Sequence, residues 1–108
     1  MDIKALPIFS KKLKKYAKKN PKIKDDFAKL LEEITNNPTN AIAIKSNVYK
    51  IRMQNSSSNK GKSGGYRVYY FYKKDDVVVL LYIYTKNEFP NLPSELLDYL
   101  IKEAKELE

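Results

Sequence analysis

The most informative stretch of the sequence runs from residue 66 to residue 84 and reads YRVYYFYKKDDVVVLLYIY. Residues 66–72 are dense in aromatic and β-branched side chains, which favour β-strands. Residues 73–76 form a polar turn. Residues 77–84 are a short, continuous apolar run, which is typical of a central strand covered on both faces. The stretch therefore predicts two antiparallel strands joined by a turn.

A third strand is expected just before this pair, in residues 48–53, where apolar side chains alternate with Lys50 and Arg52. Such alternation is typical of a strand with one face buried. Because side chains alternate between the two faces of a sheet, Lys50 and Arg52 share one face. We expect the helices to cover the opposite face.

Helical spacing of apolar residues appears on both sides of these strands, in residues 9–17, 23–34 and 96–107. Lysines fill the rest of the first helix surface. Asn20-Pro21 separates the first two helices, with Asn20 expected as the N-cap of the second helix and Pro21 at its first position. Asn36-Asn37-Pro38 ends that second helix.

The element order predicts an α+β fold in a single domain, residues 1–108. A short opening strand precedes two helices, three antiparallel strands and a last helix. We expect the helices to pack on one face of an antiparallel sheet of about four strands. A chain of 108 residues with 43% hydrophobic residues can build one core and no more.

Composition excludes several kinds of chemistry. The chain has no Cys and no His, so disulfides, thiolate nucleophiles, Ser-His catalysis and imidazole or thiolate metal sites are excluded. We expect no metal and no cofactor. Residues 1–10 lack the apolar stretch of a signal peptide, and no later run approaches a membrane span. We therefore expect a cytoplasmic protein without a membrane partner.

Charge is distributed unevenly along the chain. The formal net charge is +8, of which residues 88–108 carry −4 and the remainder +12. A small domain with that excess attracts polyanions, most commonly RNA or DNA. The alternative is that the lysines only keep the protein soluble.

The alternation of side chains along the strands predicts a cationic patch on the face that the helices leave open. Arg67 is expected to project from the same face as Tyr69, and Lys86 from the same face as Tyr84. If the register brings these sets together, the patch contains Lys50, Arg52, Arg67 and Lys86 among tyrosines. Cations bind phosphates and aromatic rings stack on unpaired bases, so the patch suits single-stranded nucleic acid. The alternative is that the cations protect the strands from aggregation and the tyrosines pack in the core.

The loop in residues 59–65, NKGKSGG, combines three glycines with Lys60, Lys62 and Ser63. Successive N–H groups of such a loop can turn inward and bind an anion. We expect Lys60, Lys62 and Ser63 to contact RNA. The loop is not a P-loop, because a strand follows it and Ser56 stands where that motif needs Gly. A simple glycine turn is the alternative.

Three motifs together resemble the RelE/HigB toxins of type II toxin–antitoxin systems. They are VYKIRM at residues 48–53, GKSGGYRV at residues 61–68 and YTKNE at residues 84–88. The similarity covers nearly the whole chain and looks closer to the HigB-like branch. It implies a small α+β fold with a curved antiparallel sheet. It also implies an endoribonuclease that cuts mRNA in the ribosomal A site of the 30S subunit.

The resemblance implies a match between the family's functional residues and individual positions of this chain. The basic pair of the first long strand falls on Lys50 and Arg52, although RelE itself has Lys at the second position. The arginine that follows the Gly-Tyr pair falls on Arg67, and the basic residue after the last strand falls on Lys86. Asn87 stands where RelE has an arginine. The catalytic tyrosine of RelE has no match, since residues 89–92 read FPNL.

These residues permit cleavage by attack of the RNA 2′-hydroxyl on the adjacent phosphate. Nearby cations would lower the pKa of Lys50 and make its neutral form accessible as a base. Arg67 would hold the scissile phosphate and stabilise its developing charge. Lys86 is either the general acid or a further clamp.

The resemblance implies a cognate antitoxin as partner, and a toxin–antitoxin complex that binds operator DNA. Two other functions stay open at this point. One is a ParE-like inhibitor of DNA gyrase, which shares the fold and is not a nuclease. The other is a non-catalytic module that binds RNA or the ribosome.

Overall fold

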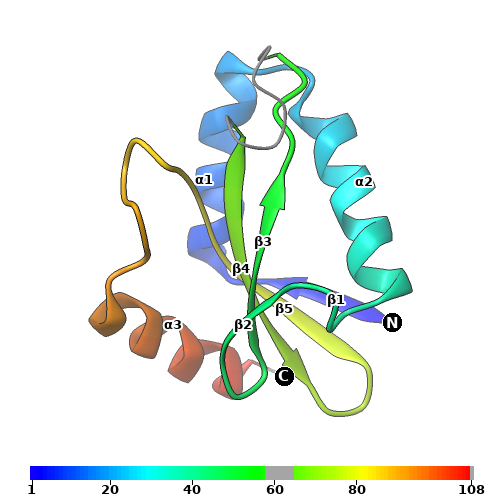
Figure 1. Ribbon diagram of the computed structural model, residues 1–108, viewed down its shortest axis with the longest axis vertical. Coiled ribbons are helices and arrows are strands. Elements are labelled where there is room, and N and C mark those ends of the chain that lie inside the picture. The colour runs from blue at the N-terminus through cyan, green and yellow to red at the C-terminus, as the bar shows by residue number, and fades with distance from the viewer. Residues whose placement is uncertain (58–64, 108) are drawn as a thin grey trace.

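The structure is a computed structural model that describes residues 1–57 and 65–107. Its elements, in chain order, are β1 (Asp2–Ala5), α1 (Pro7–Lys19), α2 (Ile23–Asn36), β2 (Ile42–Lys45), β3 (Val48–Met53), β4 (Tyr66–Lys73), β5 (Val77–Thr85) and α3 (Ser94–Glu106) (Figure 1). The predicted α+β class, the helices and the three long strands are confirmed.

The strands form one five-stranded sheet in the order β1-β5-β4-β3-β2. β1 pairs with β5 in parallel, and the other neighbours are antiparallel. The sheet is therefore mixed and larger than the prediction of about four antiparallel strands. The sequence missed β2 because its four residues are all exposed, so no alternation of buried and exposed side chains marks them.

The turns fit the strands they connect. Asp75 and Asp76 both have positive φ, 67° and 63°, as in the two-residue hairpin turns whose twist matches that of the strands. Gly65 precedes β4 beside the end of β3. A Cβ atom on Gly65 would lie 2.1 Å from the carbonyl oxygen of Met53, so only glycine lets the two strands approach here.

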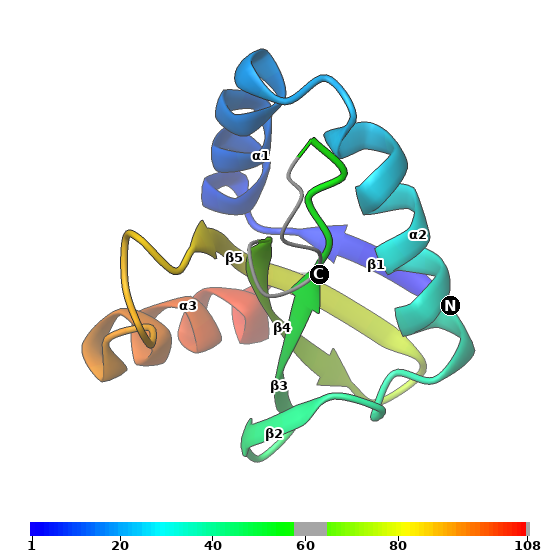
Figure 2. The same cartoon turned by 45° about the horizontal axis from the view of Figure 1, so that its top comes forward.

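Helices cover both faces of the sheet (Figure 2). α1 and α2 lie on one face, and α3 lies on the other. The first layer buries Phe9, Ile23, Leu30, Ile34, Met53, Tyr66, Val68, Tyr70, Val78, Leu80 and Ile83. The second buries Leu6, Val48, Tyr69, Phe71, Val79, Leu81, Tyr82, Tyr84, Leu92, Leu97, Leu100 and Ala104. The prediction that all helices share one face is wrong for α3, because β4 and β5 are apolar on both faces and each face needs a cover.

The junction between α1 and α2 differs in detail from the prediction. α2 begins at Ile23, after a turn at Pro21 and Lys22, so Asn20 does not cap it. The Asn20 side chain instead donates a hydrogen bond of 2.5 Å to the hydroxyl of Tyr66. This contact ties the end of α1 to the start of β4.

α3 is fastened at the Lys73 end of β4. Lys73 Nζ donates to the carbonyl oxygens of Ala104 and Leu107, at 3.3 and 2.9 Å, near the C-terminus of α3. Lys45 on β2 pairs with Asp98 at 2.8 Å. α3 covers one end of its sheet face, where Val48 and Phe71 lie, and we call this part of the face the covered end.

No helix in the described part of the chain is long and apolar enough to span a membrane.

Candidate nucleic-acid interface

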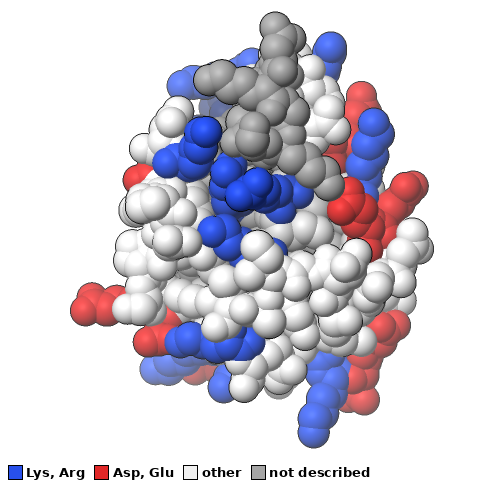
Figure 3. All heavy atoms as spheres, viewed as in Figure 1, with Lys and Arg blue, Asp and Glu red and all other residues white. Residues whose placement is uncertain are grey.

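The opposite end of the same sheet face carries Lys50, Arg52 and Arg67, and we call it the cationic end. In the β3–β4 register Arg52 faces Arg67 directly and Lys50 faces Tyr69. The predicted convergence of these three side chains on one face is therefore confirmed. Figure 3 shows Lys and Arg atoms gathered over these ends of β3 and β4, while acidic residues lie toward the rim. The arrangement can hold an anion such as a phosphate.

Arg67 is the most constrained of the three cations. Its side chain is only 7% exposed, and its Nη1 donates to the carbonyl oxygen of Gly65 at 3.1 Å. A buried guanidinium with a fixed partner is held in one direction before any ligand arrives. Arg52, by contrast, is exposed on the same face.

Lys50 lies between the strands and the loop that joins β5 to α3. Its Nζ donates to Asn91 Oδ1 at 3.2 Å and lies 5.9 Å from the ring centre of Tyr69. Partial burial lowers the pKa of Lys50, and the nearby charges of Arg67 and Arg52 lower it further. Each effect disfavours the ammonium form, which makes Lys50 the best candidate for a base at this site.

Lys86 is exposed just past the end of β5. Its neighbour Thr85 pairs with Tyr66, so Lys86 comes at the same end of the sheet as the Arg52–Arg67 pair. Its side chain makes no hydrogen bond or ion pair with another described residue. The structure thus brings three predicted cations together and leaves Lys86 at the edge of the group.

The two tyrosines expected to stack on bases are buried. Tyr69 is 2% exposed and Tyr84 is fully enclosed, so neither ring can reach a base in this conformation. The exposure expected for these rings is not found, because both pack in the core layer on the α3 side of the sheet, with the Phe89 ring edge-on against Tyr84 at 5.7 Å. Burial raises the pKa of Tyr84, and its hydroxyl has no hydrogen-bond partner among the described residues.

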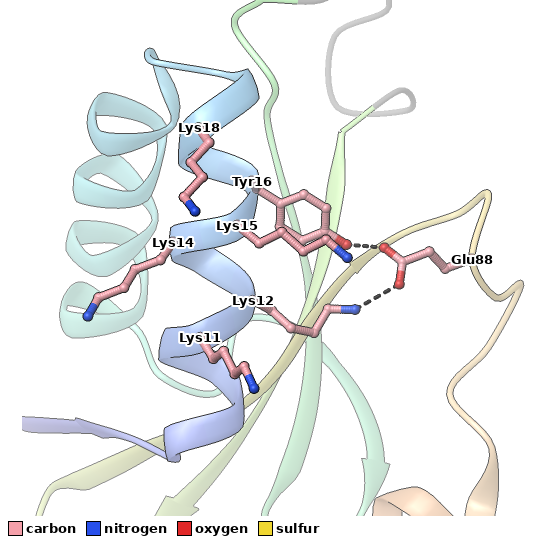
Figure 4. A pocket seen from close by; sticks show the side chains of 7 residues that line it. All are labelled: Lys11, Lys12, Lys14, Lys15, Tyr16, Lys18 and Glu88. Atoms are coloured by element: carbon pink, nitrogen blue, oxygen red, sulfur yellow. Dashed lines mark hydrogen bonds and ion pairs between the residues drawn. The ribbon is translucent and has the colours of Figure 1, made fainter.

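A groove along α1 is lined by lysines and closed on one side by the loop after β5 (Figure 4). Its volume is about 620 Å³, and its lining residues are Lys11, Lys12, Lys14, Lys15, Tyr16, Lys18 and Glu88. Glu88 accepts hydrogen bonds from Lys12 Nζ, at 2.7 Å, and from the Tyr16 hydroxyl. Burial alone would raise the pKa of Glu88, but these two donors outweigh it and lower the pKa overall. The contact fastens the β5–α3 loop to α1.

Comparison with known proteins identifies the family. A family model described as "RelE toxin of RelE / RelB toxin-antitoxin system" matches residues 7–108. The chain belongs to the RelE toxin family. The Escherichia coli RelE toxin has a similar structure in a free-state variant with two arginines changed to alanine, with 19% identity and a TM-score of 0.61 over 94% of this chain and 95% of that one. A crystal form of the isolated E. coli toxin gives 19% identity and a TM-score of 0.59, over 95% and 97%. No curated protein sequence matches significantly.

Three predicted contacts of this RelE-family toxin lie outside the described residues. Lys60, Lys62 and Ser63, expected to hold RNA phosphates, fall in residues 58–64. No group of three or more acidic side chains in the described part of the toxin could hold a metal ion.

Sequence reasoning missed the partners that the β5–α3 loop brings to the candidate site. Asn91 stands out in the sequence only as a polar residue in the segment Pro90 to Pro93, with buried Leu92 beside it. The pairing of Glu88 with Lys12 and Tyr16 has no sequence signal, because these residues lie more than 70 positions apart.

Proposed function

We propose that this toxin is an endoribonuclease that cuts mRNA on the ribosome, in the A site of the 30S subunit. We take residues 1–108 as a single RelE-like domain, closer to the HigB-like branch. The observation that carries the proposal is the convergence of Lys50, Arg52 and Arg67 on one end of a sheet face that α3 leaves uncovered. Cations from two adjacent strands can bind the oxygens of a backbone phosphate.

The proposed reaction uses the RNA itself as nucleophile. Lys50 takes the proton from the 2′-hydroxyl, and the 2′-oxygen attacks the adjacent phosphorus. Arg67, with Arg52, holds the non-bridging oxygens and stabilises the charge of the phosphorane. The bond from phosphorus to the 5′-oxygen then breaks, and Lys86 is assigned to protonate that oxygen. The products are a 2′,3′-cyclic phosphate and a 5′-hydroxyl.

The proposed dependence on the ribosome is supported by what the cationic end lacks. The aromatic rings beside it, Tyr69 and Tyr84, are buried, so they offer no stacking surface for an unpaired base. A strand surface with three cations attracts a phosphate but does little to orient the ribose that must attack it. Binding in a fixed geometry can contribute about 7–11 kcal/mol to lowering a barrier, and we assign that role to the decoding site.

The proposed protein partner is a cognate antitoxin, and the proposed compartment is the cytoplasm. An acidic peptide complements the cationic end, and the outer edge of β2 offers a place for an added strand. Ile42 and Ile44 on that strand are 60% and 38% exposed, as expected for a surface that a partner covers. We propose in addition that the toxin–antitoxin complex binds operator DNA.

Primer extension on mRNA from translating ribosomes tests the proposed activity. The toxin should create new 5′ ends within the reading frame, and Arg67→Ala should remove them. The absence of new ends with the unaltered toxin would overturn the proposal. Growth arrest with DNA-damage signals would then favour gyrase inhibition, and arrest that survives both Arg67→Ala and Lys50→Ala would favour a non-catalytic module.

A further inference from the structure

The loop between β5 and α3, residues 86–93, is anchored on both sides of Asn91. On one side, the ring of Phe89 packs edge-on against Tyr84. On the other side, Leu92 is buried in the core layer beneath α3. Glu88 adds a third anchor through Lys12 on α1. Asn91 itself is exposed, and its side chain reaches Lys50 at the cationic end. The three anchors hold the backbone on either side of it.

The Asn91 side chain meets the amine of Lys50. Lys50 Nζ donates to Asn91 Oδ1 at 3.2 Å, across 41 positions of sequence. The charged groups that bear on Lys50 are Arg67 on β4 and Arg52 on its own strand. Among the described residues, the partner from the loop is thus a neutral acceptor beside two positive charges and the ring of Tyr69.

A neutral acceptor has a specific advantage for a lysine that must act as a base. A neutral amine has two N–H donors and one lone pair. An acceptor that engages one N–H restricts the direction of the lone pair. A carboxylate at the same place would engage the N–H equally well, but its charge would stabilise the ammonium form and remove the lone pair. An amide orients the amine with much less of that penalty.

We propose that Asn91 is a positioning residue that orients the amine of Lys50 for removal of the 2′-hydroxyl proton. The inference rests on the proposed function and adds to it a residue from the β5–α3 loop. Asn91 acts through Lys50 and takes no part in bond formation.

The experiment compares Asn91→Ala and Asn91→Asp in the full-length toxin, with Asn36→Ala as a matched control on the exposed end of α2. Single-turnover cleavage of ribosome-bound mRNA is followed from about pH 6 to about pH 9, a range that covers a lowered lysine pKa. In parallel, the Cε resonance of Lys50 is titrated by NMR in ¹³C-lysine-labelled protein, and Lys50→Arg assigns it.

Asn91→Asp should move both the titration of Lys50 and the rising limb of the rate profile to higher pH, by about one unit or more. At neutral pH this shift lowers the rate about tenfold for each unit. Asn91→Ala should lower the maximal rate several-fold without a shift to higher pH and with little change in the half-saturating ribosome concentration. Asn36→Ala should match the unaltered toxin.

Equal losses in both Asn91 variants with no change in either pH curve would overturn the inference. Cleavage by the unaltered toxin together with a Lys50 titration that Asn91→Asp leaves in place would overturn the inference and leave the proposed function intact. No cleavage by the unaltered toxin would overturn both.

Discussion

The covered end and the cationic end of one sheet face are built from the same two strands. β4 presents Arg67, Tyr69, Phe71 and Lys73 to this face in turn, and the first and last lie about 20 Å apart at the usual strand rise. At the covered end, Phe71 and its β3 partner Val48 are buried beneath α3. At the cationic end, Arg52 faces Arg67, and none of the described helices lies over this end of β3 and β4 (Figure 2).

A change of side chain along one strand thus divides a single sheet face between a part that stabilises the fold and a part with a proposed catalytic role. Apolar residues attract a helix because their burial is favourable by about 25 cal/mol per Å². Arg52 at the cationic end stays exposed, since a helix over it would desolvate the charge without supplying a counter-charge. Mutations at the two ends should therefore affect different properties.

The largest expected effect is on activity at the cationic end. Lys50→Arg keeps the positive charge but removes the proposed base, so cleavage should fall by about 10²–10⁴-fold. Because the base must be neutral, the rate of the unaltered toxin should rise with pH until Lys50 has titrated, and its lowered pKa should place that rise below the usual range for lysine. Single-turnover cleavage across pH measures both, with exposed Lys24→Arg on α2 as control. A variant with the unaltered rate would remove Lys50 from the mechanism.

The second prediction compares how much each of the two ends contributes to the free energy of unfolding. Leu100 on α3 is fully buried, so Leu100→Ala should lower the free energy of unfolding by about 2–5 kcal/mol. Arg52→Ala at the cationic end removes an exposed side chain and should change the free energy by no more than about 0.5 kcal/mol. Urea unfolding followed by circular dichroism measures both values. Similar losses of unfolding free energy in the two variants would show that both ends contribute equally to stability.

A smaller effect tests the buried tyrosines. The Tyr84 hydroxyl has no partner among the described residues, whereas the Tyr70 hydroxyl donates to the carbonyl oxygen of Pro38 at 2.6 Å. Tyr84→Phe should therefore leave stability unchanged or raise it by up to about 1 kcal/mol, while Tyr70→Phe should lower it by about 0.5–1.5 kcal/mol. Thermal unfolding compares the pair. If Tyr84→Phe lowered stability as much as Tyr70→Phe, the Tyr84 hydroxyl would have a hydrogen-bond partner after all.

The smallest effect concerns the loop that borders the cationic end. Glu88→Gln weakens a partly exposed pair with Lys12 and should cost about 0.2–1 kcal/mol, less at high salt. The pKa of Glu88 is lowered in the folded state, so its contribution is present above the ordinary carboxylate pKa and is lost as the pH falls through the lowered value. Unfolding at two salt concentrations measures the effect, with exposed Glu95→Gln on α3 as control. A loss that salt does not reduce would argue against an ionic contact.

The sequence predicted the elements with long periodic patterns and the parity of their side chains. Lys50, Arg52 and Arg67 share a face because period-two alternation is a local property of each strand. The position of α3 was not predictable in the same way. An amphipathic stripe such as residues 96–107 indicates that a helix packs on something, but it does not say which sheet face receives it. The choice of sheet face by α3 determines whether Tyr69 and Tyr84 are exposed.

Contacts between distant segments were equally inaccessible from the sequence. The bond from Lys50 to Asn91 depends on where the β5–α3 loop crosses the face, and β2 depends on pairing with β3 rather than on its own four residues. In both cases tertiary packing supplies information that local patterns lack.

The end groups of the cut mRNA test most directly whether the cationic end performs attack by the 2′-hydroxyl. After incubation of the toxin with translating ribosomes, we expect fragments with 5′-hydroxyl and 2′,3′-cyclic phosphate ends, and their loss with Arg67→Ala. Fragments with 5′-phosphate and 3′-hydroxyl ends, or the same fragments in the same amount with Arg67→Ala, would contradict this mechanism.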